Sequence, residues 1–242
     1  MSKRKIALIP AAGVGSRFGS NMPKQYIEIA GQTVLSHTVN IFLNNAEIDL
    51  IAIVVSPEDN QVQTALSKPL HPKVVILPCG GETRAESVRN GVDALLNQQL
   101  AAETDWILVH DAARCCLPPA VLQRLLNEST QNETEQTGAI LAIPVADTLK
   151  RATGEHIAQT VSRQDLWQAQ TPQMFAAHLL QTALNGDLND ITDEASAVEK
   201  LGIAPKLVLG DVRNIKLTQA QDADLVRLLL NEATKLQTAT HH

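Results

Sequence analysis

Residues 7–26 read ALIPAAGVGSRFGSNMPKQY, and this stretch decides both the fold and the kind of ligand that the sequence predicts. An apolar run ends at Pro10, and the loop after it holds three glycines together with Arg17 and Lys24. A loop that only reverses the chain needs a single glycine. Glycines let the backbone approach a ligand closely, and N–H groups that follow a strand can face an anion. The stretch therefore predicts a site for an anionic ligand.

The rest of the chain alternates short apolar runs with longer amphipathic segments, which is typical of a parallel sheet covered by helices. Strands are expected at 5–10, 49–56, 73–78, 106–111 and 138–144. Helices are expected at 33–45, 84–99, 119–130 and 219–236. We therefore predict an α/β fold in one domain spanning 1–240, with a Rossmann-like, mostly parallel sheet and helices on both faces.

The region from about 145 to 172 breaks this alternation. It is polar, with threonine and valine alternating around an expected turn at Ala152–Glu155, and this pattern predicts a protruding β-hairpin arm. A hairpin without an apolar face is marginally stable alone. We expect the arm to pack on another surface, such as a second subunit.

Composition narrows the partners. A formal charge of −6 and only 2% aromatic residues argue against nucleic-acid binding, so a phosphate site must rest on a local group of cations. We find neither an apolar run long enough to span a membrane nor a signal peptide, so no membrane partner is expected. Three cysteines without a C-x-x-C pattern favour a reducing cytoplasm over a zinc ribbon or a disulfide scaffold.

Pattern alone leaves several interpretations of the opening loop. A dinucleotide-binding loop is weakly matched, because Phe18 stands where the third glycine would be. The single tyrosine, Tyr26, has no lysine four residues later, and the Walker pattern is absent, so hydride transfer and a P-loop are disfavoured. Arg17 and Lys24 favour a third interpretation, in which they neutralise the charge that grows on an α-phosphoryl group under attack.

At this point the sequence resembles the 2-C-methyl-D-erythritol 4-phosphate cytidylyltransferase family, whose fold is of the nucleotidyltransferase type. The resemblance covers nearly the whole chain. Its motifs are PAAGVGSRFGSNMPKQY at 10–26, GGETRAESVRNG at 80–91, VHDAAR at 109–114, PVADTLK at 144–150, TVSR at 160–163, QTPQMF at 170–175, TDEASAVE at 192–199 and NIKLT at 214–218.

The resemblance implies an enzyme of non-mevalonate isoprenoid precursor synthesis. CTP and methylerythritol phosphate would give 4-diphosphocytidyl-2-C-methyl-D-erythritol and pyrophosphate, with Mg²⁺ as cofactor on the triphosphate. The family also implies a homodimer with arm exchange. Two alternatives stay open, namely a cytidylyltransferase for another alditol phosphate, such as ribitol 5-phosphate, and a non-catalytic nucleotide-binding protein.

The resemblance also implies roles for individual residues. Arg17 and Lys24 match the catalytic cations. The residues that match nucleotide contacts are Ala11, Ala12, Gly13, Gly81, Glu82, Ser87 and Ala112. Those that match contacts to the second substrate are Asp111, Arg114, Thr148, Arg163, Thr171, Thr192 and Lys216, with Arg163 reaching the neighbouring subunit. Asp111 is the candidate protein ligand of Mg²⁺. Apart from the resemblance, Arg84 could as easily pair with Glu82 or Glu86, which are close in sequence.

One position departs from the family pattern. Proline usually follows the arginine of this motif, whereas Cys115 follows Arg114 here. A residue other than proline frees the φ angle and restores an N–H group. We expect a small change in loop stiffness, felt in the pose of Arg114, without lost chemistry.

Overall fold

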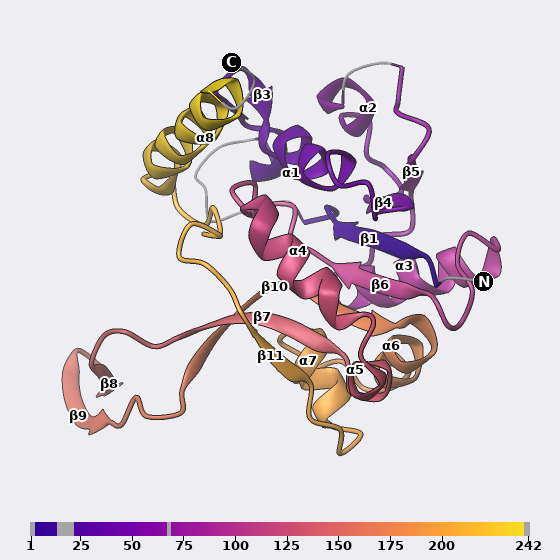
Figure 1. Cartoon of the computed structure of the whole chain (residues 1–242). Helices are drawn as coiled ribbons and strands as arrows, with labels where there is room; N and C mark the ends of the chain where they lie inside the picture. The colour runs from indigo at the N-terminus through magenta and orange to yellow at the C-terminus, as the bar shows by residue number, and fades with distance from the viewer. Residues whose placement is uncertain (1–2, 14–21, 67–68, 240–242) are drawn as a thin grey trace.

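The computed structural model describes residues 3–13, 22–66 and 69–239, and a seven-stranded sheet lies at its centre (Figure 1). The strand order is β11–β7–β10–β6–β1–β4–β5. Their bounds are β1 Lys5–Pro10, β4 Leu50–Val54, β5 Val74–Leu77, β6 Trp106–Val109, β7 Ala139–Pro144, β10 Trp167–Ala176 and β11 Lys206–Leu209. All neighbours pair in parallel except β10, which is antiparallel to both β6 and β7. The predicted mostly parallel sheet is confirmed.

Helices cover both faces of this sheet. Side chains of α1 (Val34–Leu43) and α4 (Pro119–Glu128) pack on one face, and those of α3 (Arg84–Asn97), α6 (Ala177–Leu184) and α7 (Glu194–Glu199) pack on the other. Strand β1 contributes side chains to both faces: Ala7 and Ile9 belong to the apolar cluster on one face, and Ile6 and Leu8 belong to the cluster on the other. Successive side chains of a strand point to opposite faces, so a strand buried on both sides reads as a continuous apolar run.

The remaining elements are short, apart from the last helix. They are η2 Lys24–Tyr26, β2 Glu28–Ile29, β3 Gln32–Thr33, α2 Val62–Ala65, α5 Asn132–Thr137, β8 Leu149–Thr153, β9 His156–Val161 and α8 Asp222–Ala239. Every strand and helix that the alternation predicts is present. The alternation does not predict β10, β11, α6 or α7. β11 is an apolar run of only three residues after Lys206, and the first half of β10 alternates Trp167 and Ala169 with glutamines, so neither shows the long apolar run of a strand buried on both faces.

The arm is a two-stranded sheet of its own that projects from the body of the molecule (Figure 1). Strands β8 and β9 pair antiparallel around a turn in which Gly154 has a φ of +59°, a conformation that favours glycine. The expected turn is confirmed. The arm is shorter than the predicted 145–172, however, because β10 begins at Trp167 and joins the central sheet.

No helix in the described ranges is long and apolar enough to cross a membrane. The cysteines Cys79, Cys115 and Cys116 all lie in these ranges, and none of them forms a disulfide.

Candidate functional site

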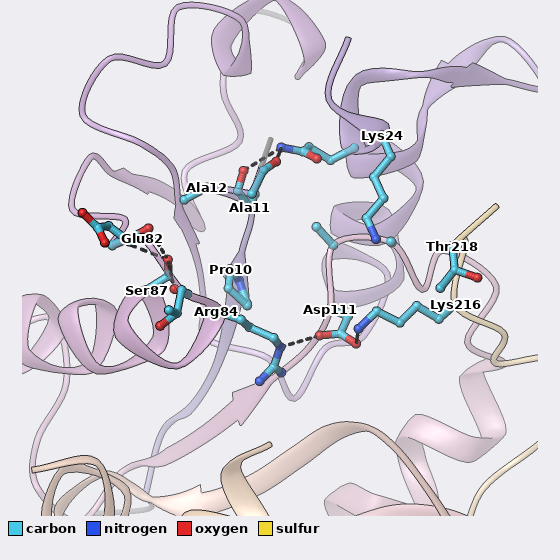
Figure 2. Close-up of a pocket in the computed structure, with 16 residues that line it drawn as sticks. Pro10, Ala11, Ala12, Lys24, Glu82, Arg84, Ser87, Asp111, Lys216 and Thr218 are labelled. Carbon is cyan, nitrogen blue, oxygen red and sulfur yellow. Dashed lines mark hydrogen bonds and ion pairs between the residues drawn. The ribbon is translucent and has the colours of Figure 1, made fainter. Parts of the chain in front are cut away.

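A cavity of about 410 Å³ lies at the carboxyl ends of β1 and β6 (Figure 2). Ligands of open α/β sheets bind at this edge, outside the carboxyl ends of the strands. The lining residues are Pro10, Ala11, Ala12, Gly13, Lys24, Gln25, Gly81, Glu82, Thr83, Arg84, Ser87, Asp111, Ala112, Ala113, Lys216 and Thr218. The structure thus brings together Lys24, all the residues predicted to contact the nucleotide, and two of those predicted for the second substrate, Asp111 and Lys216. Arg17 lies outside the described residues.

Two glycines let the segment before α3 pack closely on its neighbours. A Cβ atom on Gly80 would lie 2.3 Å from the Cβ of Ala12, and one on Gly81 would lie 2.5 Å from the Cβ of Glu86. A larger residue at Gly80 would push this segment away from the end of β1, and one at Gly81 would push it away from the first turn of α3. The glycines therefore bring backbone next to the cavity, which suits a flat or extended ligand.

The segment from Gly81 to Thr83 is held by the start of α3. The N–H of Gly81 donates to Oγ of Ser87 (3.1 Å), and the Ser87 hydroxyl donates to the carbonyl of Thr83 (2.9 Å). Thr83 and Glu86 form a reciprocal capping box, which satisfies N–H groups at the helix start. In this structure Ser87 anchors the segment that lines the cavity.

Gln25 fixes the position of Lys24. Its buried Nε2 donates to the carbonyls of Ala11 (2.8 Å) and Gly13 (3.0 Å), which ties η2 to the end of β1. The Lys24 side chain then points into the cavity (Figure 2). Sequence reasoning missed Gln25, although it stands inside the quoted PKQY motif.

Asp111 is the centre of the charges in the cavity. It is 7% exposed. Its Oδ1 accepts from Nε of Arg84 (2.8 Å), and its Oδ2 lies 2.8 Å from Nζ of Lys216 and 3.5 Å from Nε of Arg114. Burial alone would raise the pKa of the Asp111 carboxyl, but Arg84, Lys216 and Arg114 outweigh it and hold the pKa well below its usual range. Asp111 is therefore an ionised carboxylate at neutral pH.

Arg84 pairs with neither of its sequence neighbours, Glu82 and Glu86. Its guanidinium bridges Asp111 and Glu194, with Nη1 and Nη2 at 2.6 and 3.1 Å from the two Glu194 oxygens. Glu86 is instead used in the capping box at the helix start. Glu194 lies 110 residues away in sequence, so no local pattern could indicate it.

Lys216 is positioned by the segment around it. The side chain of Asn214 donates from Nδ2 to the carbonyl of Thr171 (2.8 Å), and the N–H of Leu217 donates to the carbonyl of Ala113 (2.9 Å). Arg114 donates from Nη1 to the carbonyl of Asn214 (2.6 Å). Arg114 thus lies behind the cavity lining, where it supports both Asp111 and the segment that carries Lys216.

Thr171 is also turned away from the cavity. Its buried hydroxyl accepts from the N–H of Asp111 (3.1 Å) and lies 3.1 Å from Nδ1 of His110. His110 Nε2 lies 2.9 Å from the carbonyl of Arg114, which can only accept, so Nε2 carries the proton and Nδ1 accepts from Thr171. These bonds hold the backbone of the Asp111 loop against β10.

Because His110 is completely buried, burial lowers its pKa to about 4, and the imidazole is neutral at pH 7. The unfolded chain binds a proton here below about pH 6.5, whereas the folded protein does so only below about pH 4. The stabilisation is therefore present at neutral pH and lost as the pH falls. We expect about 2 kcal/mol of unfolding free energy to be lost through this residue between pH 7 and pH 5.

Urea denaturation at both pH values tests this expectation. His110→Gln should be less stable at pH 7 and should lack this part of the pH dependence. His156→Gln, at an exposed position on β9, should keep the wild-type pH dependence. An unchanged pH dependence in His110→Gln would contradict the assignment.

The other predicted residues lie elsewhere. Thr192 lines a second cavity of about 190 Å³, which shares Thr83 and Arg84 with the first. Thr148 and Arg163 are exposed and flank the two strands of the arm. Cys115 is buried in an apolar cluster with Leu217, and the expected change in loop stiffness stays a prediction.

The described residues do not form a metal cage. They contain no group of three or more His, Cys, Asp or Glu side chains that could hold an ion. Both oxygens of Asp111 are already in ion pairs, so a cation bound there would have to share them. This donor set does not fit a site built from protein ligands alone.

Comparisons with known proteins agree with this geometry. The family model described as 2-C-methyl-D-erythritol 4-phosphate cytidylyltransferase matches residues 5–232. A protein of that name from Neisseria meningitidis serogroup C is 61% identical over 235 residues, which cover 96% of this chain and 99% of the relative. One from Laribacter hongkongensis is 49% identical over 229 residues, covering 94% and 96%.

Solved structures give the same result. A crystal structure of 4-diphosphocytidyl-2C-methyl-D-erythritol synthase is similar with a TM-score of 0.84 and 54% identity, covering 95% of this chain and 99% of that one. The structure of 2-C-methyl-D-erythritol 4-phosphate cytidylyltransferase from Thermus thermophilus has a TM-score of 0.74 at 28% identity, covering 94% and 98%.

Proposed function

The chain belongs to the 2-C-methyl-D-erythritol 4-phosphate cytidylyltransferase family, and from this we propose that it transfers CMP from CTP to 2-C-methyl-D-erythritol 4-phosphate. The products are 4-diphosphocytidyl-2-C-methyl-D-erythritol, a precursor in non-mevalonate isoprenoid synthesis, and pyrophosphate. One observation carries the proposal. The cavity at the carboxyl ends of β1 and β6 joins a wall of small residues to two lysines and an ionised aspartate.

In the proposed reaction, an oxygen of the methylerythritol phosphate attacks the α-phosphorus of CTP. A new P–O bond forms, the bond between the α-phosphorus and the bridging oxygen breaks, and pyrophosphate leaves. No covalent intermediate with the protein is needed. The protein binds both substrates in line and neutralises the charge that develops. Lys24 and Lys216 supply cationic groups to the cavity from opposite ends of the sequence.

We propose that Mg²⁺ enters as the MgCTP complex. Mg²⁺ keeps several waters and is commonly bound by substrate phosphates with one or two carboxylates. The arrangement around Asp111 fits this view, because its oxygens are taken by Arg84 and Lys216. Bound in this way, the ion would neutralise the triphosphate, while Asp111 keeps the cations of the site in place.

The nucleotide is proposed to lie along Ala11–Gly13 and the segment from Gly81 to Glu82. Gly80 packs against Ala12, so these two segments meet and form one continuous wall for the nucleotide. Ser87 would act by holding this segment, as it does in the structure.

We also propose a homodimer in which each arm completes the site of its partner. The support is the position of the arm, which projects from the body (Figure 1), with Thr148 and Arg163 next to its two strands. Ile157 on β9 is 66% exposed, as expected of a segment that packs on another chain. Such reciprocal contacts are usual in symmetric dimers. The three unpaired thiols support the cytoplasmic location expected from the sequence.

Pyrophosphate release tests the proposed reaction. The protein is incubated with MgCl₂ and CTP, and with either methylerythritol phosphate or ribitol 5-phosphate. We expect turnover with the first acceptor only. Turnover with ribitol 5-phosphate alone would transfer the chain to a different acceptor class. Folded protein that is silent with both would favour a non-catalytic nucleotide-binding protein.

A further inference from the structure

A buried acidic residue outside the cavity lining controls one of its cations. Glu194 is the first residue of α7 and is 1% exposed. Its two carboxylate oxygens accept from both Nη atoms of Arg84, at 2.6 and 3.1 Å. A buried carboxylate is costly unless it is paired and hydrogen-bonded, and this bidentate geometry provides both.

Glu194 is itself anchored to the central sheet. Gln173, 1% exposed on β10, donates from Nε2 to Oδ2 of Asp193 (2.8 Å) and accepts at Oε1 from the N–H of Ala195 (2.8 Å). Asp193 in turn caps α7 by accepting from the N–H of Ser196 (2.9 Å). The residues on both sides of Glu194 are thus fixed, so its carboxylate has a defined position.

Arg84 links Glu194 to Asp111 in the cavity. While both Nη atoms face Glu194, Nε donates to Oδ1 of Asp111 (2.8 Å). An arginine at a triphosphate site would otherwise present its fork to phosphate oxygens, because that pairing is bidentate and strong. Glu194 occupies the fork, so Arg84 is turned toward Asp111 (Figure 2). Oδ2 of Asp111 is then left facing Lys216.

We propose that Glu194 is a positioning residue for cytidylyl transfer, acting through Arg84 to orient Asp111 and, with it, Lys216. This inference rests on the proposed function. It also gives the charges a simple balance, since two carboxylates, Asp111 and Glu194, face three cations, Arg84, Arg114 and Lys216. This group of five side chains therefore carries one positive charge in excess.

The test is a double-mutant cycle measured as pyrophosphate release. Glu194→Gln keeps the size of the side chain but removes its charge, and it places an amide against the Arg84 fork. We expect kcat to fall about tenfold, because small misplacements of catalytic groups are costly. Arg84→Met should lose at least as much. The double variant should match Arg84→Met within about twofold, since Glu194 has nothing left to hold.

Controls separate this effect from a loss of structure. Glu199→Gln, at the exposed end of the same helix, should keep wild-type kcat and melting temperature. If Glu194→Gln does not fold, Arg84→Met and the double variant still complete the test, because equal kcat in these two shows that Glu194 acts only through Arg84. The double variant removes both charges of the pair, which is better tolerated than removing one and leaving the other unpaired.

The inference would be overturned if the loss of kcat in the double variant equalled the product of the losses in the two single variants. So would wild-type kcat in folded Glu194→Gln. The wild-type reaction in the same assay distinguishes the two levels. If the wild type is active and the variants are unaffected, only the role of Glu194 is refuted. If the wild type is inactive, the proposed function is refuted, and this inference with it.

Discussion

Lys24→Ala is expected to lower kcat about 100-fold. Lys24 points into the cavity from η2, where Gln25 ties that turn to the end of β1. Its ammonium group would act on charge that develops only as the α-phosphorus is attacked. Losing one such preformed contact costs on the order of 3 kcal/mol of barrier, which corresponds to this fold-change. Because the contact strengthens in the transition state, the KM for CTP should change much less than kcat.

The measurement is steady-state pyrophosphate release at saturating MgCTP and methylerythritol phosphate. Lys200→Ala removes an exposed lysine next to α7 and serves as the matched control, with wild-type kcat expected. A Lys24→Ala protein that turned over at the wild-type rate would remove this residue from the mechanism.

Arg163→Ala and Lys216→Ala are each expected to lose about 100-fold in kcat/KM, and an equal mixture of the two in shared dimers should regain activity. Lys216 lines the cavity of its own chain, whereas Arg163 lies just after β9 in the projecting arm. If the arm completes the partner's site, a mixed dimer has one site with both residues intact. About half of randomly formed dimers are mixed, so about a quarter of wild-type activity should return.

Co-expression of the two variants at equal levels provides these dimers. A second pair makes the test specific. Lys24→Ala with Lys216→Ala should show no recovery, because both residues belong to one chain's cavity and every site then lacks one of them. If Arg163→Ala with Lys216→Ala also shows no recovery of activity, the arm contributes to the site of its own chain or has no part in the site.

The sequence predicted more of the fold than of the contacts within the site. The buried strands could be predicted because a strand covered on both faces is apolar throughout, as Ile6 to Ile9 show. β10 gave no such signal, since glutamines alternate with Trp167 and Ala169 in its first half and its pairing is antiparallel. Its insertion between β6 and β7 shortened the predicted arm.

The predicted site residues gathered at one sheet edge, but their partners differed from expectation. Arg84 has Glu86 nearby in sequence and binds Glu194 instead. Thr171, predicted to offer its hydroxyl to a substrate, uses it on His110 and Asp111 in this structure. In both cases the partner comes from an element far away in the chain, and only packing brings it close.

What the sequence determined by itself is what local chemistry encodes: the alternation of strands and helices, the small residues beside the cavity, and the motifs that mark the family. The tertiary structure alone decided which charges meet. Arg84 is separated by 27 residues from Asp111 and by 110 from Glu194 in the sequence, and no local sequence pattern indicates that these side chains are in contact. The reason is physical, because a buried ion pair depends on the position and desolvation of both partners, and these are set by how whole elements pack.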